Sequence, residues 1–315
     1  MKNTIIYIFF SAAVLFTSCN VKEEPVKIND GKVAIIARMS ESDVTKTIVD
    51  ESTSHDYASG RTGLMWNSED EIGVFGGTAT NVQFANDLPP TQTAGVASFT
   101  GTIDDQIPEF AYYPYSPKAG TDLTKIPGEV PSVQTFDTDT RRIPSDYKIG
   151  GLSKTVKDGE TITGYEFYFT NILSLFCVGV DATGTELAGS TLQSVKLTFP
   201  ATGALANGTF TVNLKTRTIS LEASATPNVM TLNYSGSKNV LNENVIGYMS
   251  CAPFSARGQN VIIEVTTSTY IVTFATPLKT DFAPGFIYHF PITLKDWIGK
   301  EEVTLTPNEG GTPTN

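Results

Sequence analysis

The chain has 315 residues, with 22 Lys and Arg against 33 Asp and Glu and a formal net charge of −11. At about 150 residues per domain, this length predicts two domains, and a hydrophobic content of 40% is enough to form buried cores. The acidic balance argues against nucleic-acid binding, which needs a basic face. Two His and three Cys exclude zinc-finger and haem frameworks, so no metal and no cofactor is expected.

The first residues read as an export signal rather than as part of the fold. Lys2 is followed by the apolar run Ile5–Phe16, which is shorter than the about 20 residues of a membrane span and is typical of a signal peptide. The run ends in LFTSC, Leu15–Cys19, which resembles the lipobox of bacterial lipoproteins. That resemblance implies a signal peptide over 1–18 and palmitate-type acylation of Cys19. The alternative is an ordinary buried cysteine behind a secretory signal.

A short polar stretch follows the cysteine. Asn20–Glu24 reads NVKEE, which resembles the surface-export signal of lipoproteins in Bacteroidetes-type bacteria, although a solvated charged run is the alternative. Residues 19–31 contain Pro25 and lack apolar periodicity, which predicts a flexible acylated tether. The expected location is therefore the outer membrane, on the cell surface.

The rest of the chain is dominated by period-two alternation of apolar and polar residues, which predicts β-strands. Polar spacers of hairpin length join NVIIEV to TYIVTF, and FTVNL to TISL. Short strands separated by Gly, Pro, Asn and Asp indicate antiparallel sandwiches or barrels. The expected strands are Lys32–Met39, Glu71–Phe75, Asn81–Phe84, Val96–Thr102, Glu109–Tyr115, Thr163–Thr170, Leu173–Asp181, Val195–Phe199, Phe210–Leu214, Thr218–Leu221, Asn244–Cys251, Asn260–Val265, Thr269–Phe274 and Gly285–Leu294.

The stretch Ser116–Gly159 differs from its surroundings. It carries four prolines and little alternation, which predicts a long surface excursion with at most a short strand or helical turn near Tyr147–Leu152. The densest apolar run after the signal comes next, and we place the domain boundary inside it, near Asn171. The prediction is an N-terminal sandwich over 32–171 and a C-terminal sandwich over 172–315.

Patterns that carry catalytic chemistry are weak. The acid pairs Asp70-Glu71 and Asp104-Asp105 favour turn and rim positions over the paired carboxylates of a glycosidase, because adjacent strand residues point to opposite faces. His55 lies in a polar loop and His289 in a strand, without metal-ligand spacing. We therefore expect a protein that is not an enzyme.

Two further groups have competing interpretations. Cys177 and Cys251 lie in apolar strands, where buried free thiols are favoured over a disulfide, although the export route permits disulfides. The aromatic cluster of Phe110, Tyr112 and Tyr113 with its neighbour Tyr115 favours core and edge packing over stacking on sugar rings.

Four stretches taken together resemble the fimbrillin family, the lipoprotein pilins of anaerobic Gram-negative bacteria. Each alone is a sandwich-strand pattern, but their order and spacing cover nearly the whole chain after the signal. They are GLMWNSEDEIGVF (Gly63–Phe75), ASFTGTI with FAYYPYSP (Ala97–Pro117), YFTNILSLFCVGV (Tyr168–Val180) and GFIYHFPITLKDW (Gly285–Trp297).

The resemblance implies an all-β fold of two tandem transthyretin-like antiparallel β-sandwich domains. It also implies assembly by strand exchange. A protease removes an N-terminal strand after an arginine, and a C-terminal strand of another subunit fills the exposed groove. In this sequence the strand is KVAIIA, Lys32–Ala37, which Arg38 follows directly. Arg38 is the preferred cleavage site over Arg61, and an uncleaved Arg38 at a strand end is the alternative.

The candidate donor strand is EEVTLTP, Glu301–Pro307, in which Val303 and Leu305 share one face. The implied function is a surface-exposed structural subunit of adhesive pili. The implied partners are other pilin subunits and outer-membrane lipid through Cys19, and the adhesion ligand on a host or bacterial surface is unknown. The competing function is a monomeric cell-surface glycan-binding lipoprotein. An anchor subunit that keeps its lipid also fits the sequence.

Overall fold

The structure, a computed structural model, describes residues 32–39, 48–49, 64–77, 79–103, 107–200, 206–222, 224, 226–300 and 303–308. Within these residues the fold is all-β, and the helical elements are two 3₁₀ turns, η1 (Pro117–Ala119) and η2 (Leu294–Asp296). No helix in this part of the chain is long and apolar enough to cross a membrane.

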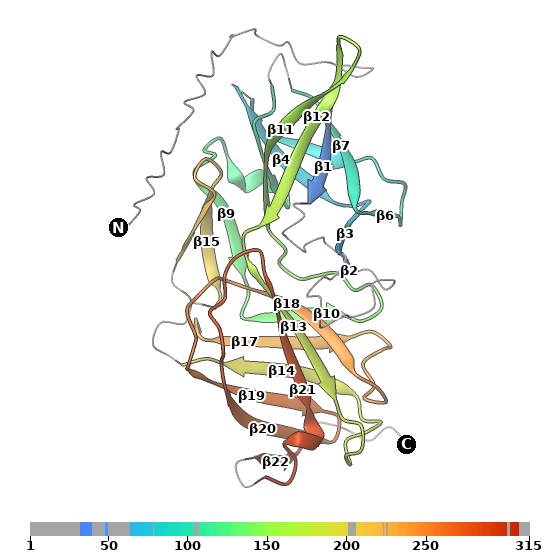
Figure 1. Ribbon diagram of the computed structural model, residues 1–315, viewed down its shortest axis with the longest axis vertical. Coiled ribbons are helices and arrows are strands. Elements are labelled where there is room, and N and C mark those ends of the chain that lie inside the picture. The colour runs from blue at the N-terminus through green and yellow to red at the C-terminus, as the bar shows by residue number, and fades with distance from the viewer. Residues whose placement is uncertain are drawn as a thin grey trace, which may run out of the picture.

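Seven of the described strands close into a barrel, seen at one end of the long axis in Figure 1. The first of these strands along the chain, β1 (Val33–Met39), pairs with β12 (Thr161–Asn171) on one side and with β7 (Val96–Gly101) on the other, so the barrel has no open edge. The order around the barrel is β1 (Val33–Met39), β12 (Thr161–Asn171), β11 (Lys148–Asp158), β8 (Phe110–Tyr113), β4 (Glu71–Gly76), β5 (Ala79–Asn86) and β7 (Val96–Gly101).

Most of the remaining strands form sheets toward the other end (Figure 1). The large sheet has the order β10 (Val133–Asp137), β17 (Val229–Ser235), β14 (Leu192–Thr198), β19 (Asn260–Thr267), β20 (Tyr270–Pro277), β22 (Thr304–Pro307). The small sheet contains β18 (Val245–Cys251), β13 (Ser174–Asp181) and β21 (Ile287–Thr293). The side sheet contains β16 (Thr218–Leu221), β15 (Gly208–Asn213) and β9 (Ile126–Val130), and a minor ladder joins β2 (Ile48–Val49), β3 (Leu64–Asn67) and β6 (Thr93–Ala94).

Two hydrophobic clusters stabilise these layers. The barrel core is built around Trp66, whose ring makes edge contacts with Phe99, Tyr113 and Phe169 at centroid distances of 5.0, 5.5 and 5.4 Å. The second cluster fills the space between the large and small sheets and includes Phe176, which packs against Phe282. The alternation of apolar and polar residues explains both clusters, because one face of each strand points into a core.

The all-β class is confirmed, and so are the two predicted hairpins, β15–β16 and β19–β20. Sandwiches alone do not describe the fold, because seven of the described strands close into a barrel. The expected antiparallel pairing is wrong for three strand pairs, which are parallel: β1 with β12, β10 with β17, and β13 with β21. Parallel partners are distant in sequence, so no local turn signal announces them. The transthyretin-like arrangement stays a prediction.

The predicted surface excursion over Ser116–Gly159 is also wrong. It contains β9, β10 and β11, and the first two pair with β15 and β17. In β9 the residues Pro127 and Gly128 hide the strand pattern, but β9 is an edge strand, where a missing N–H is tolerated. In β10 the buried position beside Phe136 is Gln134, whose amide bonds the backbone of Ser250 at 2.7 Å and 2.9 Å.

Candidate functional site

The strand β1 is the element that completes the barrel. Val33, Ile35 and Ala37 alternate along it and are fully buried in the barrel core. In the register, Ile35 lies opposite Phe99 of β7 and opposite Tyr165 of β12, both also fully buried. Removing β1 would therefore leave two unpaired strand edges beside an apolar groove.

Arg38 is the next-to-last residue of β1 and carries the strand's charged contact. Its Nε donates to Glu166 Oε2 at 2.8 Å, and Lys154 Nζ lies 3.4 Å from Glu166 Oε1. The hydrogen bond from Arg38 lowers the pKa of Glu166. The Arg38 side chain is 42% exposed, against 3% for Glu166. The guanidinium is therefore partly exposed, while the backbone of Arg38 is paired on both sides.

Other predicted site residues lie outside the described part of the chain, namely Cys19, Arg61 and the acid pair Asp104-Asp105. The tether and His55 lie outside it as well.

The candidate donor strand is β22, which occupies the edge of the large sheet. Leu305 lies opposite Val272 of β20, and both Leu305 and Val303 are half-buried against the second cluster. Thr304 and Thr306 face solvent. Because β22 is short and three of its four residues are exposed, its attachment to β20 buries little apolar surface. It is nevertheless anchored by Asn308, whose Nδ2 donates to Thr267 O at 2.6 Å.

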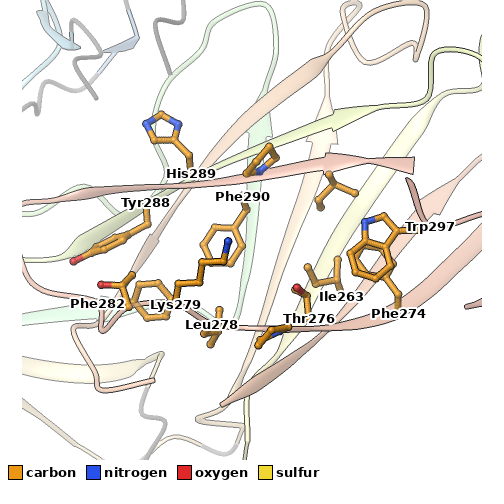
Figure 2. Close-up of a pocket in the computed structure, with 14 residues that line it drawn as sticks. Ile263, Phe274, Thr276, Leu278, Lys279, Phe282, Tyr288, His289, Phe290 and Trp297 are labelled. Atoms are coloured by element: carbon orange, nitrogen blue, oxygen red, sulfur yellow. The ribbon is translucent and has the colours of Figure 1, made fainter. Parts of the chain in front are cut away.

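An aromatic pocket of about 410 Å³ lies between β20 of the large sheet and β21 of the small sheet (Figure 2). Trp297 is one of its half-buried aromatic rings, and this ring already has two neighbours. Phe274 stacks on it at a centroid distance of 4.2 Å and an interplanar angle of 20°, and Lys300 Nζ lies over the ring at 4.7 Å. Tyr288 is held too, since its hydroxyl accepts from Ala283 N–H at 2.7 Å. Both rings therefore make contacts within the fold, Tyr288 also through edge contacts with Phe176 and Phe282.

The burial of His289, which also lines this pocket, lowers the pKa of its imidazole. Among the described residues, no three or more His, Cys, Asp or Glu side chains gather as a metal site would require.

The two cysteines and two tyrosines of the aromatic cluster are buried in the fold. Cys177 and Cys251 are both buried free thiols, and the register places them opposite Tyr248 and Ser174 instead of opposite each other. Burial raises the pKa of Cys177 to about 11. Tyr112 and Tyr113 are core residues, so core packing, the favoured interpretation, holds for these two.

Asp70 is buried, whereas the sequence predicts a turn or rim position for it. It follows a turn, where Asn67 N–H donates to its Oδ2 at 2.8 Å, but it is only 1% exposed. Tyr113 Oη donates to Asp70 Oδ1 at 2.9 Å, and Arg142 reaches the same oxygen at 3.3 Å. The sequence gives no local sign of this burial, because the partners are distant along the chain.

Comparisons with known proteins agree on the family and the fold. A protein-family model described as fimbrillin-like matches residues 53–308. A crystal structure of a proposed cell adhesion protein from Bacteroides uniformis is similar with a TM-score of 0.53 and 19% identity, covering 89% of this chain and 98% of that one. A second, from Bacteroides ovatus, has a TM-score of 0.50 and 17% identity, with coverages of 88% and 95%. No curated protein sequence matches the chain.

Proposed function

The chain belongs to the fimbrillin-like family, and from this premise we propose that it is a surface-exposed pilin-like adhesion subunit that assembles by strand exchange. In this proposal the chain reaches the cell surface as a lipoprotein acylated at Cys19. A protease cleaves after Arg38 and releases β1. The C-terminal strand of another subunit then fills the vacated place in the barrel.

The observation that carries the proposal is the position of β1. It is a whole strand whose alternate side chains are buried, and the arginine lies at its end. Loss of β1 would expose the groove that holds Val33 and Ile35. The burial of each large apolar side chain stabilises the fold by about 1.5–3 kcal/mol, and this free energy would be lost. An incoming strand would regain that free energy and pair with both β7 and β12.

The donor segment has the spacing that this groove requires. Val33, Ile35 and Ala37 recur at every second residue, and so do Val303, Leu305 and Pro307. In the proposed complex Val303 takes the place of Val33, and Leu305 lies between Phe99 and Tyr165 in the place of Ile35. Proline at the third position ends the strand, since it has no N–H to donate.

Cleavage after Arg38 is tested by the N-terminus of protein taken from intact cell surfaces. We expect a start at Met39 without lipid, measured by N-terminal sequencing and mass spectrometry. Arg38→Ala should keep the acylated Cys19 and stay out of SDS-resistant oligomers, while Arg61→Ala, the matched control, is processed normally. A wild-type start at acylated Cys19 would contradict the mechanism.

The donor role is tested at Leu305. Leu305→Asp should abolish SDS-resistant oligomers, because a carboxylate cannot be buried between two aromatic rings without a partner. Thr304→Asp is the matched control, since Thr304 is exposed and lies on the other face of the strand. Both variants should fold and export, as judged by surface amount. Equal oligomerisation of the two variants would rule out this segment as the donor.

A further inference from the structure

Three polar side chains meet at the base of the β11–β12 hairpin, inside the fold. Asp146 precedes β11, Lys148 begins it, and Asn171 ends β12. Lys148 and Asn171 are directly paired in the antiparallel register. Their residues are nearly inaccessible, with exposures of 5% for Asp146, 1% for Lys148 and 6% for Asn171. A fully buried lysine is rare and needs a physical account.

The contacts place a carboxylate between an amine and a carboxamide. Lys148 Nζ donates to Asp146 Oδ2. Asn171 Nδ2 donates to Asp146 Oδ1 at 3.3 Å. Asn171 Oδ1 in turn accepts from the backbone N–H of Leu173 at 3.1 Å. The carboxamide carbon is therefore polarised by a backbone donor on its oxygen, while its nitrogen faces a proton carrier.

Burial of Lys148 favours an uncharged amine. Two contacts oppose this, because Lys148 Nζ lies over the ring of Tyr113 at 5.0 Å and near that of Trp66 at 5.7 Å, and aromatic faces attract a cation. Burial lowers the pKa of Lys148 to about 7, although the charge of Asp70 opposes the shift. An amine that loses its proton near neutral pH is a nucleophile, as in enzymes that form covalent bonds through lysine.

We propose that Lys148 and Asn171 are joined by an intramolecular isopeptide bond that the folded protein forms by itself. Proton transfer along the hydrogen bond from Lys148 to Asp146 gives a neutral amine beside a neutral carboxylic acid. The lone pair of Nζ attacks Cγ of Asn171, and the N–H of Leu173 stabilises the negative charge on Oδ1. Asp146 gives its proton to the departing nitrogen and recovers one from Nζ. The C–Nδ2 bond breaks, one ammonia leaves, and the Nζ–Cγ amide remains.

The carboxamide of Asn171 suits this reaction better than the nearby carboxylates. Asp146 is needed as the proton carrier between the two groups. Asp70 is bound by Tyr113 and Arg142, and an ionised carboxylate resists attack at its carbon. The masses separate the possibilities, because reaction at asparagine releases ammonia while reaction at aspartate releases water.

The test is tryptic peptide mapping and intact mass of the full-length protein purified from cells. We expect an intact mass lower by one ammonia than the mass of the same chain without the bond. Trypsin should fail to cut after Lys148, giving the peptide Ile143–Lys154 joined to Asp158–Lys196. Separate, unlinked peptides would overturn the proposal. A loss of one water with a crosslink to Asp70 or Asp146 would also overturn it.

Variants test the three roles. Lys148→Arg and Asp146→Asn should each restore the missing ammonia mass and lower the melting temperature relative to the wild type. Lys125→Arg is the matched control, since Lys125 is an exposed lysine on the same chain, and it should keep the crosslink. If Lys148→Arg does not accumulate, the wild-type peptide map still decides the question, because it needs no variant. Retention of the crosslink in Asp146→Asn would overturn the proton-carrier role.

Discussion

Aspartate in place of Ile35 is expected to lower the stability of the unprocessed barrel to that of a chain that starts at Met39. Ile35 is fully buried between Phe99 and Tyr165, and an uncompensated charge there costs about 3–5 kcal/mol. The substitution should prevent β1 from pairing in the barrel. The free energy of unfolding is measured by urea denaturation followed by tryptophan fluorescence, in a Trp297→Phe background where Trp66 of the barrel is the remaining tryptophan.

The matched control is Ile36→Asp, one residue along the same strand. Ile36 is half-exposed because its side chain lies on the opposite face from Ile35. Its substitution should leave most of the barrel stability. Equal losses for the two variants would mean that β1 does not hold the barrel through its inward face, and strand release would lose its energetic basis.

The second large loss of stability is expected for Trp66→Ala. Trp66 is fully buried and contacts three aromatic rings in the barrel core, so its removal leaves a cavity that costs about 3–5 kcal/mol. Trp66→Phe should cost less, since it keeps a ring and removes an indole N–H that has no hydrogen-bond partner among the described residues. Urea unfolding followed by circular dichroism gives both values.

Trp297→Ala provides the comparison from the other end of the molecule. Trp297 is half-buried and stacks mainly on Phe274, so a smaller loss is expected. A loss at Trp297 as large as that at Trp66 would show that the barrel core is not the better packed of the two sites.

Local patterns in the sequence predict local structure well. The hairpins β15–β16 and β19–β20 follow from alternation and short polar spacers, and β1 follows from its compact apolar run before Arg38. Each of these depends on neighbours in sequence, so the residues themselves carry the information.

The sequence does not predict which distant segments pair with each other. For example, β10 pairs with β17, but the residues VQTFD of β10 do not indicate this partner. The same holds for the burial of Asp70 and Lys148. A lysine or aspartate in a sequence is read as exposed, and only the assembled barrel shows the aromatic rings and polar groups that surround each one. Sheet closure through β1 belongs to the same class, because both of its partners lie far along the chain.

The pairing of β9 and β10 with later strands also constrains the order of folding. Val133 of β10 pairs with Thr231, and Val130 of β9 pairs with Gly208, so a chain that emerges from its N-terminus presents both strands long before their partners. Contacts of such large sequence separation slow folding. During that interval the two segments carry open backbone edges. Until the second half of the chain is available, these edges are places where another chain can pair.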